Sequence, residues 1–283
     1  MTWKDLYPFQ PNFTTSPDGY RLHHVQQGDG SPMVMLHGNP TWSFFYRQLI
    51  PAAAQAGYHA YALDNLGCGL SDKPQEWPYH LDGHIRNLEK WLDEDLRLKD
   101  ITLVLHDWGG GIGMGYAVRH PENIRRIVLM NTAAYLSDDC PKRIFLGRCP
   151  FLGAFLIRGC NAFVEGAIRM AAARRLPKEV ADGYRAPYGN WHDRIATQRF
   201  VQDIPLKPTH PTWNTLKAIQ EGLPLLQDKP ITLIWGAQDF CFHTGFYDRW
   251  REIYPHARAV SLPEASHYLL EDAPERVIRE ILT

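Results

Sequence analysis

The sequence has no long apolar run and no excess of one charge. Its mean hydropathy is −0.35, and no apolar stretch approaches the roughly 18 residues that a membrane-spanning helix needs. Thirty basic residues are balanced by 31 acidic ones, which gives a formal net charge of −1. A nucleic-acid-binding domain typically carries a strongly basic face. We therefore expect neither a transmembrane segment nor a nucleic-acid partner.

Cysteine pairs and a signal peptide are also missing. The chain has five cysteines, an odd number, and no C-x-x-C pair. This pattern indicates neither a disulfide framework nor a zinc site, so we expect no metal, no other cofactor and a reducing cytoplasm. The first ten residues, MTWKDLYPFQ, lack the basic and then apolar pattern of a signal peptide.

Short apolar runs alternate with helical patterns along most of the chain. Its 283 residues can bury one large core and carry an inserted subdomain. Apolar residues recur every three or four positions from Leu81 to Leu96, which predicts an amphipathic helix. Strands that alternate with helices predict an α/β fold with a mostly parallel sheet. The predicted strands are 21–28 (an edge strand), 33–36, 59–63, 101–105, 124–130, 231–235 and 257–262, and a closing helix is predicted at 274–282.

This alternation stops between residues 133 and about 225. The stretch mixes helical apolar patches with arginine, proline and glycine, and none of its segments predicts a strand as strongly as the flanking runs. We therefore predict a helical cap at 133–225, inserted into a core formed by 1–132 and 226–283. Aromatic residues make up 12% of the chain, which suits a deep apolar pocket.

The stretch ITLVLHDWGGGIGMG at 101–115 carries the clearest functional signal. An apolar run bounded by glycines is typical of a strand buried on both faces, and the glycines let a helix begin at once. Asp107 is then expected at a nucleophile elbow, with aspartate in place of serine. The alternative is that Asp107 is only an N-cap, and Leu105 replaces the first glycine of the elbow consensus. No G-x-G-x-x-G spacing is present, so a dinucleotide loop is not expected.

Two more polar groups follow the last two predicted strands. Asp239 comes after 231–235, and His267 comes after 257–262. In open α/β sheets, ligands bind at the carboxyl ends of the strands. The order nucleophile, acid, histidine is the chain order of the α/β-hydrolases. These coincident placements favour a catalytic triad of Asp107, Asp239 and His267.

An aspartate nucleophile narrows the chemistry. Attack of its carboxylate on carbon forms an alkyl ester, which suits substrates with a leaving group on sp³ carbon. His267, oriented by Asp239, can then activate a water that hydrolyses this ester. The backbone N–H groups of Asn39 and Trp108 are expected to form an oxyanion hole. Their side-chain N–H groups can donate to a departing anion.

Four segments resemble the haloalkane dehalogenases of the α/β-hydrolase superfamily. They are HGNPTW at 37–42, GCGLSDKP at 67–74, HDWGG at 106–110 and SHYLLEDAPE at 266–275. The resemblance covers essentially the whole core and implies that Trp108 and Asn39 bind the leaving anion. It also implies that Asp239 is the acid, because Asn131 stands where another dehalogenase subfamily has its carboxylate.

The cap is similar to one branch of that family. RGCNAFVEGAIRM at 158–170 and RIATQRFVQDIPL at 194–206 resemble the branch that contains the β-lactone decarboxylases of bacterial long-chain olefin biosynthesis. The resemblance implies that Asp107 attacks a long-chain cis-β-lactone and that loss of CO₂ leaves a cis-alkene. This path needs no hydrolytic water, so it leaves the role of His267 open. It also makes other olefin-pathway enzymes candidate partners.

Three other functions stay open at this point. Haloalkane hydrolysis to alcohol and halide would use the same site. Epoxide hydrolysis would need two cap tyrosines to protonate the epoxide oxygen, and Tyr135, Tyr184 and Tyr188 are available. A hydrolase fold can also serve as a ligand receptor, although an intact triad argues against this function. Asp64 and Asp72 are expected to structure the loop after the third strand rather than to act in catalysis.

Overall fold

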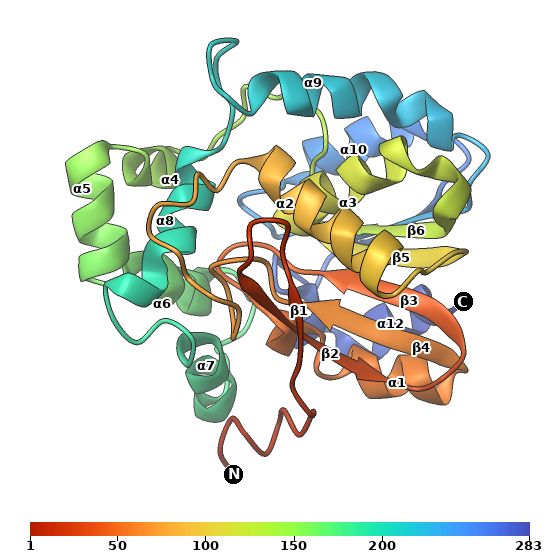
Figure 1. The fold of residues 1–283 in the computed structure, drawn as a ribbon, viewed down its shortest axis with the longest axis horizontal. Helices are drawn as coiled ribbons and strands as arrows, with labels where there is room; N and C mark the ends of the chain where they lie inside the picture. Colours follow the sequence, from red (N-terminus) through yellow and green to blue (C-terminus); the bar gives the residue numbers. More distant parts are fainter.

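The computed structural model describes residues 1–283, and its centre is one eight-stranded sheet (Figure 1). The strand order is β1-β2-β4-β3-β5-β6-β7-β8. Strands β3 to β8 run parallel, whereas β1 and β2 pair in antiparallel fashion. The strands are β1 (Asn12–Thr15), β2 (Arg21–Gln27), β3 (Ser31–Leu36), β4 (Tyr58–Leu63), β5 (Ile101–His106), β6 (Ile124–Met130), β7 (Ile231–Gly236) and β8 (Arg258–Leu262). This is the predicted α/β class.

Helices cover both faces of the sheet. The helices around the core are α1 (Leu49–Gln55), α2 (Leu81–Glu89), α3 (Trp108–Arg119), α9 (Trp213–Gly222), α10 (Thr244–Ile253), α11 (Leu269–Asp272) and α12 (Pro274–Leu282). Successive strand residues point to opposite faces. Leu103 and Leu105 therefore join the cluster formed with α2, α3 and α9, whereas Val104 joins the cluster formed with α1 and α12. Burial on both faces explains why β5 contains only apolar or β-branched residues from Ile101 to Leu105.

Helix α3 lies directly against its neighbours because glycine replaces side chains at two contact points. A Cβ on Gly113 would stand 2.3 Å from Cδ2 of Leu105. A Cβ on Gly115 would stand 2.3 Å from Cδ1 of Ile85 in α2. The glycines after Asp107 thus allow α3 to begin immediately and to pack against β5 and α2.

The amino-terminal strands differ from the prediction. We predicted an edge strand at 21–28, but β2 lies between β1 and β4, and β1 is the edge strand. Strand β1 has only four residues, NFTT, and Phe13 is about half exposed. So short a strand carries no hydrophobic pattern, and its place is decided by pairing with β2. The other six predicted strands are confirmed to within two residues at each end.

The amphipathic helix from Leu81 to Leu96 also differs in its second half. Helix α2 ends at Glu89 and continues as a π-helical turn, η2 (Lys90–Asp95). The wider turn brings the adjacent residues Trp91 and Leu92 to the buried side. The closing helix is confirmed, because α12 spans 274–282.

Only helices and turns lie between β6 and β7. They are α4 (Lys142–Gly147), α5 (Pro150–Ala154), η4 (Phe155–Gly159), α6 (Ala162–Met170), α7 (Lys178–Arg185), η5 (His192–Arg194), α8 (Ile195–Gln202), α9 and η6 (Leu223–Leu226). Figure 1 shows α4 to α8 together at the left of the sheet, beyond the carboxyl ends of β3 and β4. Helix α9 instead packs on α2 and α3. The cap boundaries of 133 and 225 stay a prediction.

By length and composition alone, one bent pair of helical segments in this cap could be considered as a membrane span. No single helix of the chain is long and apolar enough to cross a membrane. The helical segments Pro150–Gly159 and Ala162–Met170 meet the criteria of length and composition only when they are taken together, and they are bent by 68°.

Candidate active site

Asp107 lies at the end of β5, where the chain turns into α3. Its φ of 52° and ψ of −126° fall in a region that is unfavourable for a residue with a side chain. The turn is held through the Asp107 carbonyl, which accepts hydrogen bonds from Thr132 Oγ1 at 2.5 Å and from the Gly110 N–H at 2.9 Å. Asp107 occupies the N-cap position of α3, but its side chain makes no capping hydrogen bond there, so capping does not account for its carboxylate.

The Asp107 carboxylate lies against the loop that follows β3. A Cβ on Gly38 would stand 1.9 Å from Asp107 Oδ1, so this approach requires glycine. The Asn39 backbone N–H donates to Oδ1 at 2.6 Å. Burial raises the pKa of Asp107, while the charge of His267 and the backbone N–H groups of Trp108 and Asn39 act to lower it. At the predicted oxyanion hole, the Asn39 N–H thus bonds the carboxylate, and the Trp108 N–H acts on its pKa.

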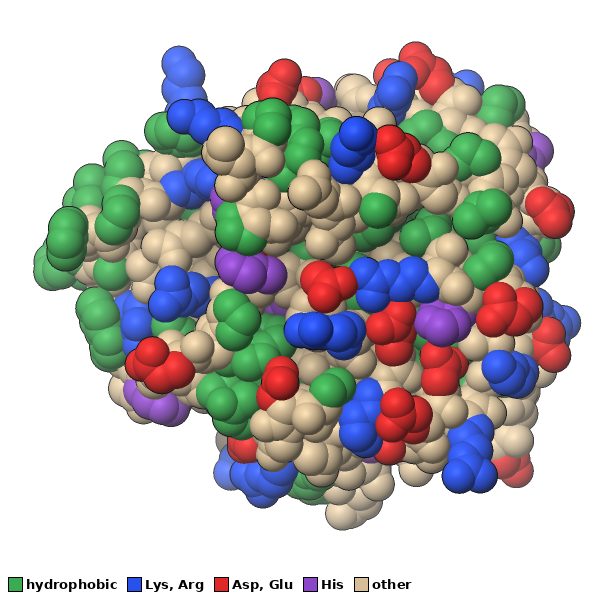
Figure 2. Space-filling model, turned by 45° about the horizontal axis from the view of Figure 1, so that its top comes forward, with side chains coloured by type: hydrophobic (Ala, Val, Ile, Leu, Met, Phe, Trp, Pro, Cys, Tyr) green, Lys and Arg blue, Asp and Glu red, His purple; other side chains and the backbone are tan.

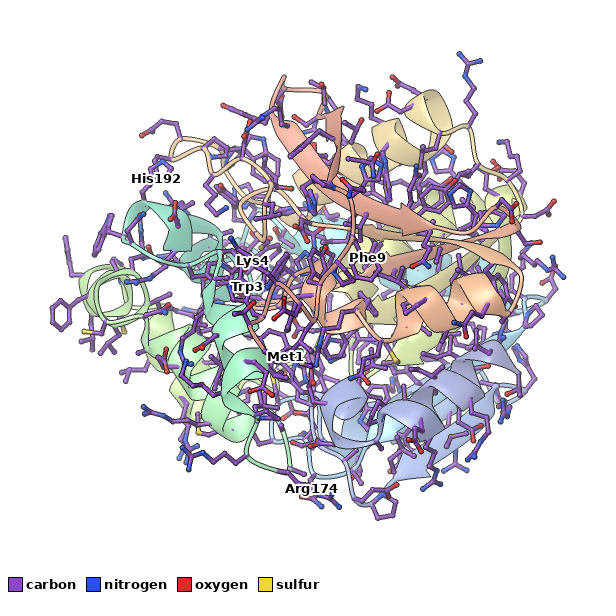
Figure 3. All side chains as sticks on the ribbon, turned by 90° about the horizontal axis from the view of Figure 1, so that it is seen from below. Met1, Trp3, Lys4, Phe9, Arg174 and His192 are labelled. Atoms are coloured by element: carbon purple, nitrogen blue, oxygen red, sulfur yellow. The ribbon has the colours of Figure 1, made fainter.

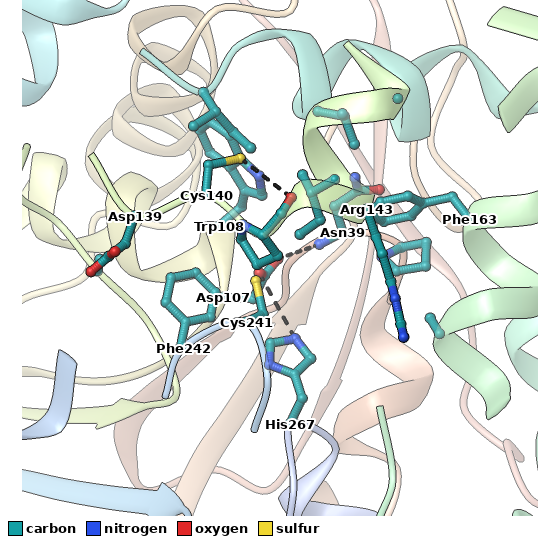
Figure 4. Close-up of a pocket in the computed structure, with 18 of the residues that line it drawn as sticks. Asn39, Asp107, Trp108, Asp139, Cys140, Arg143, Phe163, Cys241, Phe242 and His267 are labelled. Atoms are coloured by element: carbon teal, nitrogen blue, oxygen red, sulfur yellow. Dashed lines mark hydrogen bonds and ion pairs between the residues drawn. The ribbon is translucent and has the colours of Figure 1, made fainter. Parts of the chain in front are cut away.

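His267 lies between the two aspartates. Its Nδ1 donates to Asp239 Oδ2 at 2.7 Å, and its Nε2 is 3.8 Å from Asp107 Oδ2. The structure therefore brings together all three residues of the predicted triad from the ends of β5, β7 and β8. Figure 4 shows His267 facing Asp107. Burial alone would lower the pKa of His267, but the charges of Asp239 and Asp107 and the bond to Asp239 raise it above the ordinary value.

A second histidine, His106, packs against His267 and bonds its backbone. His106 Nε2 donates to the His267 carbonyl at 2.9 Å, and the two rings are 4.5 Å apart. Burial and the nearby His267 hold the pKa of His106 well below its usual range, so this ring is neutral. The Phe242 ring stacks on His267 at 5.9 Å. Packing on both sides fixes the His267 imidazole.

The carboxylate of Asp239, the predicted acid, is held by groups that the sequence did not single out for this purpose. Asn131 Nδ2 donates to Asp239 Oδ2 at 3.0 Å, while its other polar atom accepts from the Gly236 N–H at 2.8 Å. The Cys241 N–H donates to Asp239 Oδ1 at 2.7 Å. Asn131 thus orients the carboxylate, a role that becomes visible only when β6 and β7 lie side by side.

The two expected anion-binding side chains differ in their partners. Asn39 Nδ2 donates to the Thr197 carbonyl of α8 at 3.0 Å, so one of its two amide hydrogens is already used. Its Oδ1 is buried without a partner. Trp108 Nε1 makes no hydrogen bond within the protein, and both residues line the pocket. The Trp108 indole is therefore a free donor beside Asp107.

The site opens into one large, mainly apolar pocket (Figure 4). Of the 33 residues that line it, 20 are hydrophobic. One wall comes from the loop after β7, including Phe240 and Phe242, and another comes from the cap, including Ile157 and Phe163. The sequence indicated an apolar pocket but not its lining, because these residues meet only in the folded chain. Such a pocket suits an apolar substrate.

The remaining sequence candidates lie away from the reacting atoms. Only Tyr135 of the three cap tyrosines lines the pocket. The Tyr184 hydroxyl instead bonds Glu271, and the Tyr188 hydroxyl donates to the Thr41 carbonyl at 3.3 Å. The pair of tyrosines that epoxide hydrolysis requires is therefore not assembled.

Asp64 structures its loop, as expected. It is fully buried and accepts hydrogen bonds from the Ser43 N–H at 2.7 Å, from the Leu70 N–H at 2.9 Å and from His23 Nδ1 at 2.8 Å. Burial would raise the pKa of Asp64, but His23 and these bonds lower it to about 2. Asp72 binds Arg21 at the surface. No group of three His, Cys, Asp or Glu side chains is arranged to hold a metal ion.

The family assignment agrees with this geometry. The alpha/beta hydrolase fold family matches residues 31–274, and the chain belongs to it. This confirms the α/β-hydrolase fold predicted from the motifs.

Individual relatives show which members of the family this chain is similar to. The chain is 43% identical to the cis-3-alkyl-4-alkyloxetan-2-one decarboxylase of Shewanella oneidensis, over 98% of this chain and 88% of the relative. It is 34% identical to haloalkane dehalogenase 2 of Mycobacterium tuberculosis, over 98% and 95% of the two chains. It superposes on an ancestral haloalkane dehalogenase with a TM-score of 0.87, at 27% identity, over 96% of each chain. These relatives are enzymes, and they are the two groups that the motifs resemble.

Proposed function

We propose that this protein is a β-lactone decarboxylase that converts long-chain cis-3-alkyl-4-alkyloxetan-2-ones into cis-alkenes and CO₂. The observation that carries the proposal is the 43% identity to a decarboxylase of these lactones over 98% of the chain. The apolar pocket that ends at Asp107 supports it, because two alkyl chains need an apolar binding site.

The first step is attack by Asp107. Its Oδ2 does not accept the Asn39 bond that Oδ1 accepts, and it attacks ring carbon 4 of the lactone from the side opposite to the ring oxygen. The bond between carbon 4 and the ring oxygen breaks, and its electron pair leaves as a carboxylate. The product is an alkyl ester on Asp107. Trp108 Nε1 and the second Asn39 amide hydrogen donate to the new carboxylate.

The second step releases the products. The bond between the carboxylate and carbon 3 breaks, which frees CO₂, and its electron pair forms the double bond to carbon 4. The ester bond to Asp107 breaks at the same time and restores the carboxylate. Inversion at carbon 4 followed by anti departure gives a cis-alkene from a cis-lactone. Atoms and charge balance without water.

His267 then acts as a charge partner instead of a base. Its Nε2 lies 3.8 Å from Asp107 Oδ2, and its raised pKa favours the imidazolium. A positive charge at this place stabilises the Asp107 carboxylate as it leaves in the second step. Asp239 holds the ring in place.

Haloalkane hydrolysis is the second candidate. The free indole N–H of Trp108 and the whole-length likeness to a dehalogenase structure favour it. In this reaction His267 is neutral when it activates a water that hydrolyses the alkyl ester. Formation of the ester removes the Asp107 charge that helps to raise the pKa of His267. The same residues thus serve both reactions, and the substrate decides whether water is needed.

We also propose the setting of the reaction. The alkene product places the protein in olefin biosynthesis, with the other enzymes of that route as candidate partners. The five free cysteines suit a reducing cytoplasm.

The test is a side-by-side assay of the purified protein with a long-chain cis-β-lactone and with 1,2-dibromoethane. Alkene is measured by gas chromatography, and halide by ion chromatography. Rapid alkene formation with little halide release is expected. Rapid halide release without alkene would reverse the order of the two candidates. Release of neither product would contradict both.

A further inference from the structure

The outward side of the cap carries large apolar side chains. Phe145, Leu146, Phe151, Leu152 and Phe155 project from α4, α5 and η4, and we call these five residues the apolar tip. Phe151 is 92% exposed and Phe155 is 62% exposed. Figure 2 shows hydrophobic side chains gathered at the left end of the molecule, over the region of α5. Such gatherings on a soluble surface mark a contact with a partner or a membrane.

The same helices are apolar on their inner side as well. Ile144, Leu156 and Ile157 line the pocket, while their sequence neighbours Phe145 and Phe155 face outward. A helix that is apolar all round is normally buried in protein or in lipid. The inner side has its partner in the substrate pocket, and the outer side has none in the folded chain.

The stretch of sequence that carries the tip has a strongly one-sided charge. Residues 140–175 contain seven basic side chains and one acidic side chain, a formal charge of +6 in a chain whose net charge is −1. The one acidic residue, Glu165, is already paired with Arg185. Arg174, near the end of this segment, projects from the lower edge of the molecule in Figure 3, apart from α5 at the left. The exposed basic residues of this segment are Lys142, Arg143, Arg169, Arg174 and Arg175.

The combination of apolar and basic residues indicates what kind of surface the tip binds. Aromatic and leucine side chains flanked by arginine and lysine are typical of surfaces that lie in the head-group region of an anionic bilayer. A second copy of this chain would bring two segments of charge +6 face to face, and like charges oppose that contact. An anionic lipid surface satisfies both the apolar tip and its charge.

We propose that the apolar tip and its basic residues dock this protein on anionic lipid bilayers, with Phe151 and Phe155 inserted among the lipid chains. Arg143 and Met170 are exposed and also line the pocket, so the pocket reaches the surface beside the tip. An apolar substrate dissolved in the bilayer then enters the pocket directly. This delivery rests on the proposed function, whereas the docking does not.

The first test is co-sedimentation with vesicles of phosphatidylcholine mixed with phosphatidylglycerol. Binding is expected to be strong, to weaken with added salt and to fall on pure phosphatidylcholine. The double variant Phe151→Ser/Phe155→Ser is expected to lower the partition coefficient at least about tenfold. Leu225→Ser is the matched control, because Leu225 is 58% exposed on η6, outside the cap segment that carries the tip. It is expected to bind like the wild type.

The contribution of the basic residues to vesicle binding is tested separately. Lys142→Glu/Arg169→Glu is expected to weaken binding to the mixed vesicles by about tenfold or more. Lys217→Glu/Arg249→Glu, at exposed positions on α9 and α10, makes the same change in net charge and is the control. It is expected to have little effect. Thermal unfolding of every variant confirms that its fold is retained.

Two outcomes would overturn the proposal. One is no binding to the mixed vesicles, or binding that the phenylalanine variant leaves unchanged. The other is an oligomer that the same variant dissociates while the vesicles capture nothing, which would make the tip a self-association surface. Turnover of a short, water-soluble cis-β-lactone is measured in parallel. Vesicle binding without alkene formation would contradict the proposed function and leave the docking supported.

Discussion

The edge of the sheet and the tip of the cap are built in opposite ways. Asp107, Asp239 and His267 are buried at strand ends and held by hydrogen bonds from several elements. The tip residues lie on short helices, and Phe151 is 92% exposed. The sheet edge therefore holds the candidate catalytic groups in a defined arrangement, as catalysis requires. The cap instead presents surface, both to the substrate inside and to a partner outside.

This difference indicates a division of tasks. Changes at the sheet edge should alter the chemistry for every substrate. Changes at the tip should alter access to lipid-dissolved substrate and leave soluble substrates unaffected. Each prediction below tests one side of that division.

Asp107→Ala should have the largest effect. Both alkene formation and halide release are expected to fall at least about 10⁴-fold, because the nucleophile is removed. The fold should persist, since the variant also removes a buried carboxylate that desolvation disfavours. Product assays and thermal unfolding check both points. Turnover near the wild-type rate would contradict the assignment of Asp107 as nucleophile.

His267→Ala should separate the two reactions. Dehalogenation is expected to fall about 10³-fold and to leave an alkyl ester on Asp107, because no base activates water. Decarboxylation is expected to fall less, since it consumes no water. Intact-protein mass spectrometry detects the ester. A burst of halide with no adduct would count against hydrolysis through this ester. Asp239→Asn is the companion variant, because it keeps the imidazole of His267 and replaces the carboxylate that bonds it.

Trp108→Phe tests the anion site. Loss of one donor to a developing anion typically costs about 10²–10³ in turnover, and we expect a decrease of that order with both substrates. Trp191→Phe is the matched control, because Trp191 is half-exposed on the cap and does not line the pocket. An unchanged rate for Trp108→Phe would place the leaving anion elsewhere.

Asp64→Asn tests stability at the sheet edge instead of chemistry. Its fully buried carboxylate binds His23 and two backbone N–H groups, so its replacement is expected to cost about 3 kcal/mol in the free energy of unfolding. Asp72→Asn, at the surface, should cost about 1 kcal/mol or less. Urea denaturation measures both.

The stabilisation that Asp64 provides should decrease at low pH. The folded pKa of Asp64 is about 2, below the ordinary value of 3.8. The stabilisation is therefore present above about pH 4 and is lost as the pH falls toward 2. The difference between wild type and Asp64→Asn should shrink over that range. A constant difference would contradict the lowered pKa.

Most of the sheet could be predicted because its signals are local. A strand that is buried on both faces is rich in apolar and β-branched residues, which makes β5, β7 and the second half of β6 visible in the sequence. The polar residues after those runs meet at one edge because parallel strands all end there. This is why Asp107, Asp239 and His267 could be placed together before the structure was known. Their catalytic roles stay predictions.

Other features carry no local pattern. Strand β1 is four residues long, and only its pairing with β2 makes it the edge. The π-helical turn after α2 depends on what Trp91 and Leu92 contact. The bond from Asn39 to the Thr197 carbonyl joins residues 158 positions apart.

The sequence by itself determined the α/β class, the elbow and the candidate triad. Each of these follows from local patterns, namely the residues within a strand and those directly after it. Only the tertiary structure decided which side of each cap helix is buried. The apolar residues of 144–157 look alike in the sequence, yet Ile144 and Ile157 line the pocket while Phe151 and Phe155 face outward. Burial is a property of what packs against a side chain, and those neighbours come from distant parts of the chain.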